Sequence, residues 1–415
     1  MKAKLQKPFS YASQQSILQF MDANQRAQLC RRSFSIRVAD KSVSLYIKNL
    51  IIDEKCFSIN NHNYKLGIYR KHVNMWKHVD TTPNSIKESN ASGGLLYDLD
   101  EYGCRDWKPD RVVTSGDVHL SEIRSNPEEN DKYKMKILMQ RLNQAYKEDN
   151  QADIEKYETE MSFINHREMQ TKPPYDFYIQ LTITSPRGVQ IERVVYGKKL
   201  YEARKMLLSA LLRRGSTVIV KRFNVAIEEG VLRWPLDLRL VVQNLKFPDM
   251  AMFEDFKKVL CDSSFPLKKL KTIEYRQNYP EVTKEVMKNA EQLEIKWVDL
   301  GQLLNDEELG SCKRLCLAPT FERDVLHLDV VRYWIVSNKQ VGSFWKFVSP
   351  IYDGLLNSLV QTFDAVRCDS KTVHVPMNNN TVIVVCVTED ANEHDEHFEP
   401  YLTMEVVPGE SVLEK

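Results

Sequence analysis

Residues 177–196, FYIQLTITSPRGVQIERVVY, consist of two runs of alternating apolar and polar residues with a Pro-Arg-Gly turn at 186–188. Alternation with period two is typical of strands, so this stretch predicts a β-hairpin. The following residues 198–215, KKLYEARKMLLSALLRRG, place apolar side chains at helical spacing and end at a glycine, which predicts an amphipathic helix. Residues 216–225, STVIVKRFNV, then predict another strand. This order of elements indicates an α+β fold.

Strand-like segments recur after the hairpin at intervals of roughly 20–30 residues, with helical candidates between them. They are LRLVV (238–242), LKTIEY (270–275), LEIKW (293–297) and RLCLA (314–318). A unit of one strand and one helix leaves an apolar face uncovered until the next unit stacks on it. We therefore expect a C-terminal α/β domain of loosely repeated strand-helix units, although the spacing is too irregular for a regular horseshoe.

The sequence before the hairpin changes character several times. Residues 42–70 alternate and predict a small antiparallel β unit, whereas residues 80–127 are rich in loop-forming residues. Asn126 precedes a proline and two acidic residues, which together predict the start of a charged helical spacer that Pro173 and Pro174 end. We expect four parts: short N-terminal helices at 1–40, the β unit with its loops at 41–125, the spacer at 126–173, and the α/β recognition domain at 174–415.

The overall composition excludes several classes of protein. Of the 415 residues, 42% are hydrophobic and 28% are charged, with a net charge of +1, so no global field attracts nucleic acid or an anionic membrane. The longest apolar runs suit a buried strand and are too short to span a membrane. The basic N-terminus lacks the apolar segment of a secretory signal, and the eight cysteines are typical of reduced thiols. We expect a cytoplasmic or nuclear protein that binds neither nucleic acid nor membranes.

Motifs of catalysis are scarce. The sequence contains no phosphate-binding glycine loop and no nucleophile elbow. His394 and His397 lie three residues apart in an acidic run, which is not the spacing of a zinc site. Asp98 and Asp100 form an Asp-x-Asp pattern that carries Mg²⁺ in some transferases, yet three residues of this kind recur by chance. We expect no catalytic residue, no metal and no cofactor, and a metal-dependent transferase is a distant third hypothesis.

Aromatic residues are concentrated in the C-terminal half. We expect Trp297 and Trp334 to fill the core between the β and α layers. The segment VGSFWKF (341–347) is apolar enough to include an exposed recognition patch. The sequence leaves both interpretations of this segment open.

The N-terminal stretch QSILQFMDANQRAQLCRR (15–32) predicts two short amphipathic helices. Asp22 and Gln25 have the spacing of a capping box at the start of the second helix. The apolar residues of the two helices are Ile17, Leu18, Phe20 and Met21 in the first, and Leu29 and Cys30 in the second. These side chains either cover the protein's own core or bind a partner.

The segment KPFSYASQQSILQFMDANQRAQLCRRSFSIR (7–37) resembles the F-box, with a proline near its start and apolar residues in both helices. Four further segments are similar to the expanded nematode family of F-box C proteins, which carry a family-specific domain of unknown function. They are GGLLYDLDEYG (93–103), RLCLA (314–318), VVRYWIVSNKQVGSFWKF (330–347) and YLTMEVVPG (401–409).

This resemblance implies that the helices dock on a Skp-type adaptor of a cullin ubiquitin ligase and that the C-terminal domain presents an unknown protein substrate. Carried over by position, the adaptor contacts would be Pro8, Ile17, Leu18 and Leu29. Apolar helices without a cover of their own suit a groove on a partner. The alternative is an intracellular protein-binding scaffold without a ligase role, in which the N-terminal helices belong to its own core.

Overall fold

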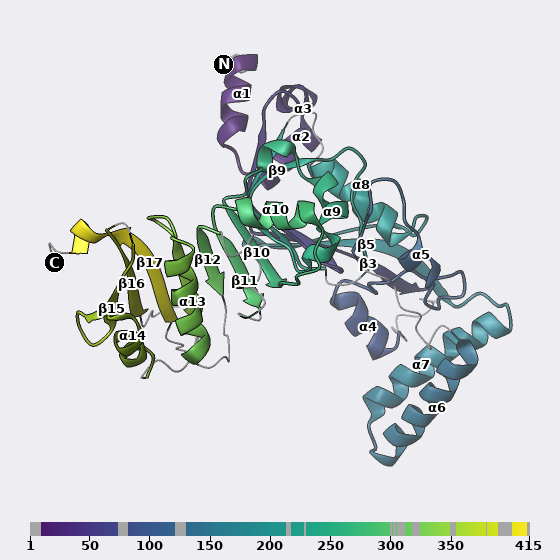
Figure 1. Ribbon diagram of the computed structural model, residues 1–415. Coiled ribbons are helices and arrows are strands. Elements are labelled where there is room, and N and C mark those ends of the chain that lie inside the picture. The colour runs from purple at the N-terminus through teal and green to yellow at the C-terminus, as the bar shows by residue number, and fades with distance from the viewer. Residues whose placement is uncertain are drawn as a thin grey trace. The chain divides into compact units, whose positions relative to one another are not determined.

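The structure is a computed structural model, and most of the chain is described in it. The described residues are 10–73, 82–120, 130–212, 217–227, 230–298, 301, 304, 312–317, 324–348, 354–378, 380–388 and 401–412. The chain forms two compact units (Figure 1). Unit 1 comprises residues 1–219 and 226–239, and unit 2 comprises residues 220–225 and 240–415.

Unit 1 contains an antiparallel sheet whose strands follow the order β1-β2-β3-β5-β6. The strands are β1 (Leu45–Ile52), β2 (Cys56–Ile59), β3 (His62–His72), β5 (Tyr175–Ser185) and β6 (Gly188–Val195). Hydrophobic alternation places Leu66, Ile68 and Ile179 in one buried cluster with Leu200 of the following helix. The hairpin predicted at residues 177–196 is therefore confirmed as β5 and β6, and its helix covers the sheet.

The helices of unit 1 begin where polar side chains accept hydrogen bonds from the first backbone N–H groups, as at Ser10, Asp22, Asn130 and Asn150. Two short strands, β4 (Val118–His119) and β8 (Val231–Leu232), form a separate antiparallel pair. The helices are α1 (Tyr11–Phe20), α2 (Ala23–Arg32), α3 (Phe34–Asp40), α4 (Asn84–Ala91), α5 (Lys108–Arg111), α6 (Asp131–Lys147), α7 (Gln151–Glu168) and α8 (Leu200–Leu212).

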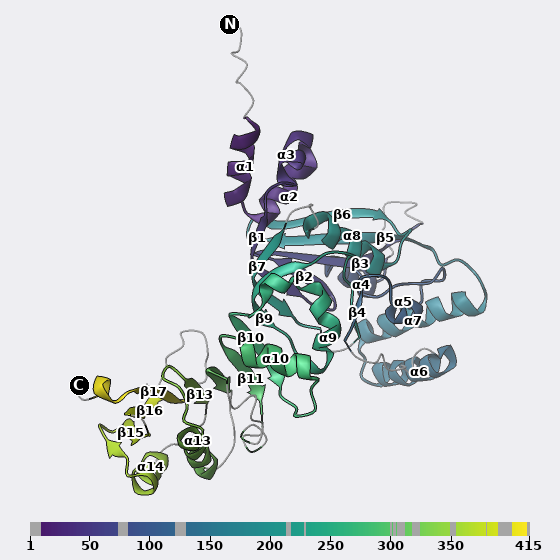
Figure 2. The same ribbon diagram turned by 45° about the horizontal axis from the view of Figure 1, so that its top comes forward.

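The expected charged spacer is a helical hairpin, α6 and α7, whose two helices lie side by side (Figure 2). Its first helix begins at Asp131 after the cap Asn130, and the stretch 126–129 lies outside the described residues. Leu138 and Phe163 join a buried cluster with Tyr175 of β5. This burial makes the hairpin part of unit 1, because its apolar stripe needs the sheet as a cover.

Unit 2 contains a mixed sheet with the order β7-β9-β10-β11-β12-β13-β17-β16-β15-β14. Strands β9 to β13 run parallel, and β13, β17, β16, β15 and β14 pair antiparallel. The strands are β7 (Val218–Val225), β9 (Leu240–Lys246), β10 (Lys269–Glu274), β11 (Leu293–Trp297), β12 (Arg314–Leu317), β13 (Phe344–Val348), β14 (Val366–Arg367), β15 (Thr372–Pro376), β16 (Thr381–Thr388) and β17 (Tyr401–Pro408).

The parallel strands share one buried row of side chains. Leu245, Leu270, Leu293, Leu315 and Trp345 are neighbours across five consecutive strands, and each is buried. Strands buried in this way need helices in the crossover connections. The repeated strand-like segments of the sequence are therefore the parallel core of unit 2.

Helices follow several of these strands. They are α9 (Phe253–Phe256), α10 (Glu281–Asn289), α13 (Asp324–Val336) and α14 (Leu355–Phe363). In Figure 1, α10 lies alongside α9, and α14 packs against α13 and β15. The α+β class predicted from the sequence is confirmed.

The four-part division predicted from the sequence stays a prediction. The contacts within the chain group its residues into two units with other boundaries. Residues 174–219 belong to unit 1 rather than to the C-terminal unit, since β5 pairs with β3. Residues 80–127, expected as loops, include α4, whose eight residues form about two helical turns. That helix packs against β3 and α7, so tertiary burial of Ile86 stabilises a weak helix former.

The aromatic concentration of unit 2 is largely core. Trp334 is fully buried, as expected, and its ring lies edge-on to that of Trp345, with centroids 5.4 Å apart. Trp345 and Phe347 of the candidate patch at 341–347 are also buried, whereas Val341 at its start is 46% exposed. The expectation for Trp297 is wrong: it ends β11, where its side chain is 48% exposed.

Candidate partner-binding surface

Helices α1, α2 and α3 form a small group at the start of unit 1, here called the N-terminal cap (residues 11–40), which both views show together (Figures 1 and 2). The second helix begins at Asp22, whose carboxylate accepts a hydrogen bond from the Asn24 N–H at 2.9 Å. The third begins at Ser33, which caps the Ile36 N–H. The sequence predicted the first two helices and the capping of the second helix by Asp22, but not the third helix.

One arginine anchors the N-terminal cap. Arg26 of α2 is 1% exposed, and its guanidinium forms an ion pair with the buried Asp40 at the end of α3. It also donates to the backbone carbonyls of Ser44 (2.7 Å), Val43 and Leu18. All three helices of the cap and the approach to β1 are thus joined through one side chain, which makes Arg26 a structural residue.

A second polar network joins α2 to the β2–β3 hairpin. The Asn24 amide donates to the Ile59 carbonyl at 3.0 Å and accepts from the Tyr64 hydroxyl at 2.8 Å. The Asn60 amide donates to the Asp22 carboxylate at 2.6 Å. These bonds fix α2 on unit 1 at several points, because buried polar groups with satisfied hydrogen bonds define a single arrangement.

The outer side of the cap exposes several large apolar side chains. Phe20 at the end of α1 is 88% exposed, and Phe34 at the start of α3 is 77% exposed. Ile17, Val38 and Tyr11 are each between two fifths and about half exposed. Large apolar side chains exposed on two helices that pack against each other, α1 and α3, indicate an interaction surface.

The predicted adaptor contacts occupy different environments. Ile17 is 44% exposed and lies on the apolar outer side. Leu18 is only 2% exposed, and Leu29 is half-buried. Pro8 lies outside the described residues. Sequence reasoning placed Phe20 in the apolar cluster of α1, but it did not identify Phe34 because α3 was not expected.

Asp98 and Asp100 have partners within unit 1. Asp98 is buried and accepts hydrogen bonds from the Tyr196 hydroxyl and from the Leu200 N–H, both at 2.8 Å. Burial raises the pKa of Asp98. Asp100 forms an ion pair with Arg167 of α7 at 2.8 Å. The Asp98 carboxylate fixes the start of α8, and the Asp100 carboxylate fixes α7. Both carboxylates therefore have a structural role.

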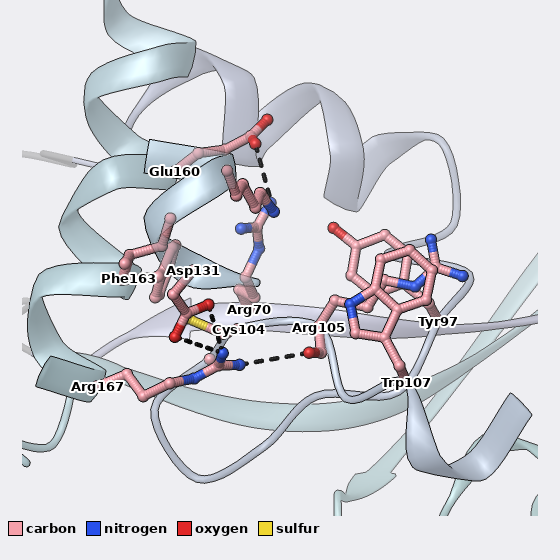
Figure 3. Close-up of a pocket in the computed structure, with 12 residues that line it drawn as sticks. Arg70, Tyr97, Cys104, Arg105, Trp107, Asp131, Glu160, Phe163 and Arg167 are labelled. Atoms are coloured by element: carbon pink, nitrogen blue, oxygen red, sulfur yellow. Dashed lines mark hydrogen bonds and ion pairs between the residues drawn. The ribbon is translucent and has the colours of Figure 1, made fainter. Parts of the chain in front are cut away.

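A small pocket of about 40 Å³ lies where the α6–α7 hairpin meets the rest of unit 1 (Figure 3). In Figure 3, Arg70 faces Glu160, and Arg167 donates to Asp131 at 2.7 Å. Burial raises the pKa of the Cys104 thiol to about 12, which keeps it protonated and a poor nucleophile. The pocket has room for ordered water only, so its charged groups connect elements of the fold.

The described residues bear on two other classes of protein, metal-binding and membrane-spanning. Among them, no three His, Cys, Asp or Glu side chains are grouped as a metal site. None of the described helices combines the length and apolar character needed to cross a bilayer. His394 and His397 lie outside the described residues.

Comparison with protein families gives one match. Residues 199–350 match the family described as a domain of unknown function, DUF3557. The match begins at α8 and ends just after β13, and it spans fewer than half of the 415 residues. Comparison with curated proteins and with solved structures gives no match. The chain thus contains an unknown-function domain, as the sequence resemblance implied.

Proposed function

We propose that this protein is a non-catalytic protein-interaction module, the substrate-recognition subunit of F-box type in a Skp-cullin ubiquitin ligase. In this proposal the N-terminal cap binds a Skp-type adaptor and the remainder of the chain presents an unknown protein substrate. The protein acts in the cytoplasm or nucleus, where ubiquitin ligases operate. The sequence resemblance to the F-box C proteins supplies the identity of the partner.

The observation that supports the proposal most strongly is the two-sided character of the N-terminal cap. Its inner side is fixed by the buried Arg26 and Asn24, whereas its outer side exposes Ile17, Phe20 and Phe34. Exposed aromatic side chains on a rigid support are typical anchors of protein interfaces, because little conformational entropy is lost on binding.

A specific observation favours the alternative, a scaffold without a ligase role. Leu18, one of the predicted contacts, is 2% exposed and packs inside unit 1. Its carbonyl lies 3.5 Å from a guanidinium nitrogen of Arg26. In the scaffold hypothesis the N-terminal cap is simply the end of the protein's own core.

The two hypotheses differ in the effect of Ile17→Asp. The ligase hypothesis predicts that a Skp-type adaptor co-purifies with the wild-type chain and is lost with Ile17→Asp at an unchanged melting temperature. The scaffold hypothesis predicts no adaptor and a lower melting temperature, because a charge would enter the core. The measurement is affinity purification with mass spectrometry, together with thermal unfolding of both proteins.

Leu18→Ala provides the matched control. It removes a neighbouring side chain of the same helix that points inward, so it lowers stability without altering the outer apolar side. Retention of the adaptor by folded Leu18→Ala and its loss from Ile17→Asp support the proposal. Absence of a Skp-type adaptor from the wild-type purification contradicts it.

A further inference from the structure

Unit 1 contains a cleft of about 760 Å³ that the proposed function does not use. Its walls come from the β1–β2 turn, β3, the loop 94–98, α5, α8 and the chain around β8. This volume lies in the range of sites for small organic ligands. The apolar part of the lining is formed by Leu66, Leu95, Leu96, Leu200, Ile227 and Val231.

The loop 94–98 is held rigidly against β3. Leu95 and Ile68 exchange two backbone hydrogen bonds, of 2.7 and 3.0 Å. Gly94 has a φ of +89°, and a Cβ there would lie 2.7 Å from the Ile68 carbonyl oxygen. A side chain at this position would push the loop away, so the wall of the cleft depends on the glycine.

Two of the three arginines in the cleft have counter-ions. Arg233 is buried, forms an ion pair with Asp117 at 3.1 Å and donates to backbone carbonyls. Arg105 forms an ion pair with Asp110 at 3.0 Å and stacks over Trp107, 3.5 Å from the ring centroid. These two guanidinium groups are explained by the fold.

Arg204 of α8 differs from both. Its Nη1 donates a long hydrogen bond of 3.4 Å to the Asp53 carbonyl, and no carboxylate of the described residues forms an ion pair with it. Burial lowers the pKa of Arg204 to about 10. A guanidinium has five N–H donors, so most of the donors of Arg204 are left for another acceptor. Asp53 and Glu54 offset only part of this effect of burial, so among the described residues the cation has no ion-pair partner beside an apolar wall. An anionic ligand would offset the cost of its burial.

We propose that this cleft binds a ligand with an anionic group on an apolar body, the anion meeting Arg204 and the body contacting the leucines of the wall. Carboxylate, phosphate and sulfonate share the oxygen geometry that a guanidinium prefers. The site is separate from the N-terminal cap, and the inference does not depend on adaptor binding.

A pair of fluorescent probes tests this chemistry directly. 8-Anilinonaphthalene-1-sulfonate carries an anion, and N-phenyl-1-naphthylamine is its neutral counterpart. We expect the sulfonate to bind the full chain and Arg204→Gln to weaken this binding by about 10- to 100-fold, the range of hydrogen bonds to charged groups. Binding of the neutral probe should not depend on Arg204. The control is Arg276→Gln, which removes an exposed arginine paired with Glu274 in unit 2.

Thermal unfolding distinguishes a ligand-binding arginine from a structural one. Arg204→Gln should leave the melting temperature unchanged or raise it, whereas Arg233→Gln should lower it, since Asp117 would lose a buried partner. Equal destabilisation by the two variants would make Arg204 structural and overturn the proposal. Sulfonate binding that does not change in Arg204→Gln would also overturn it.

Two competitors separate the sources of the anionic group. Decanoate represents a free organic acid, and a leucine-flanked phosphoserine peptide represents a segment of a protein. Displacement of the sulfonate probe by either supports the proposal and identifies the source. If neither decanoate nor the peptide displaces the sulfonate probe, the proposal is overturned. The cleft would then not bind ligands that combine an anion with an apolar body.

Discussion

The N-terminal cap and the cleft each contain an arginine whose side chain is at least partly buried in unit 1, Arg26 and Arg204. The two arginines differ in the groups that surround the guanidinium. Arg26 has a buried carboxylate and several carbonyls at its guanidinium, and it is 1% exposed. Among the described residues, Arg204 makes one long hydrogen bond, to the Asp53 carbonyl, and its side chain lines an open cleft. The same residue type is thus a structural connector in one region and an available donor in the other.

This difference shows where each region can act. In the cap, Asn24 and Arg26 are buried with their hydrogen bonds made, so the exposed apolar residues remain for a partner. In the cleft, the apolar residues form the wall and the charge remains for a ligand. We expect binding where the fold leaves an apolar side chain in water or a charged side chain without a counter-ion. In the cap these are apolar side chains, and in the cleft it is the guanidinium of Arg204.

The largest expected effect tests the structural half of the comparison. Arg26→Met would leave Asp40 buried without its counter-ion and four backbone carbonyls without their donor. We expect unit 1 to lose about 3–5 kcal/mol of stability, the usual cost of breaking a buried pair. Urea denaturation followed by circular dichroism measures this loss. A change below about 1 kcal/mol would contradict the assignment of Arg26 as the anchor of the cap.

A smaller effect separates the inner side of α1 from its outer side. Leu18→Ala should cost about 2–5 kcal/mol, because Leu18 is 2% exposed and its removal leaves a cavity. Ile17→Ala should cost much less, since nearly half of this side chain is already in water. Equal midpoints of denaturation for the two variants would contradict the burial of Leu18 and the exposure of Ile17 on opposite sides of α1.

The pH dependence of stability tests the paired arginine of the cleft. Burial acts to raise the pKa of Asp117, but hydrogen bonds from the Thr114 N–H and from Lys205 hold it below its usual value. A folded-state pKa below the unfolded one contributes stability at neutral pH that is lost as the pH falls from about 5 through the folded pKa.

Asp117→Asn should therefore be less stable than the wild type at pH 7, and the difference should shrink towards pH 3. Urea midpoints at the two pH values measure it. A difference that stays constant with pH would show that the charge of Asp117 contributes nothing to unit 1. The result sharpens the contrast with Arg204, whose substitution removes no such carboxylate pair.

The smallest stability effect concerns the exposed aromatic residues of the cap. Phe20→Asp and Phe34→Asp should each change the free energy of unfolding by no more than about 0.5 kcal/mol, because these side chains are largely in water. Thermal and urea unfolding measure this. A loss of several kcal/mol would place the two rings inside the fold and favour the scaffold hypothesis.

Local sequence patterns predicted the elements whose own residues define them. The hairpin at 177–196, the helix at 200–212 and the parallel strands of unit 2 follow from periodicity and turn residues. Helices α3 and α4 were missed because they are short and gain stability from packing, which periodicity does not record.

The candidate sites were less accessible to sequence reasoning. The buried side of α2 contains residues 23, 26, 27 and 30. The position of Arg26 at helical spacing between alanines is a sequence signal that could have indicated a buried ion pair. Nothing comparable marks Arg204, whose carbonyl contact comes from Asp53, 151 residues earlier in the chain. Long-range partners decide whether a charge is satisfied, and one sequence does not show them.

The central claim is that the exposed apolar side chains of the N-terminal cap bind a partner without contributing to the fold. Titration of a purified Skp-type adaptor into the chain by isothermal calorimetry, with wild type, Phe20→Asp and Leu18→Ala, tests it most directly. The account predicts saturable binding to wild type and folded Leu18→Ala, and at least tenfold weaker binding to an equally stable Phe20→Asp. Equal affinity of Phe20→Asp and wild type, or no binding to wild type, would contradict it.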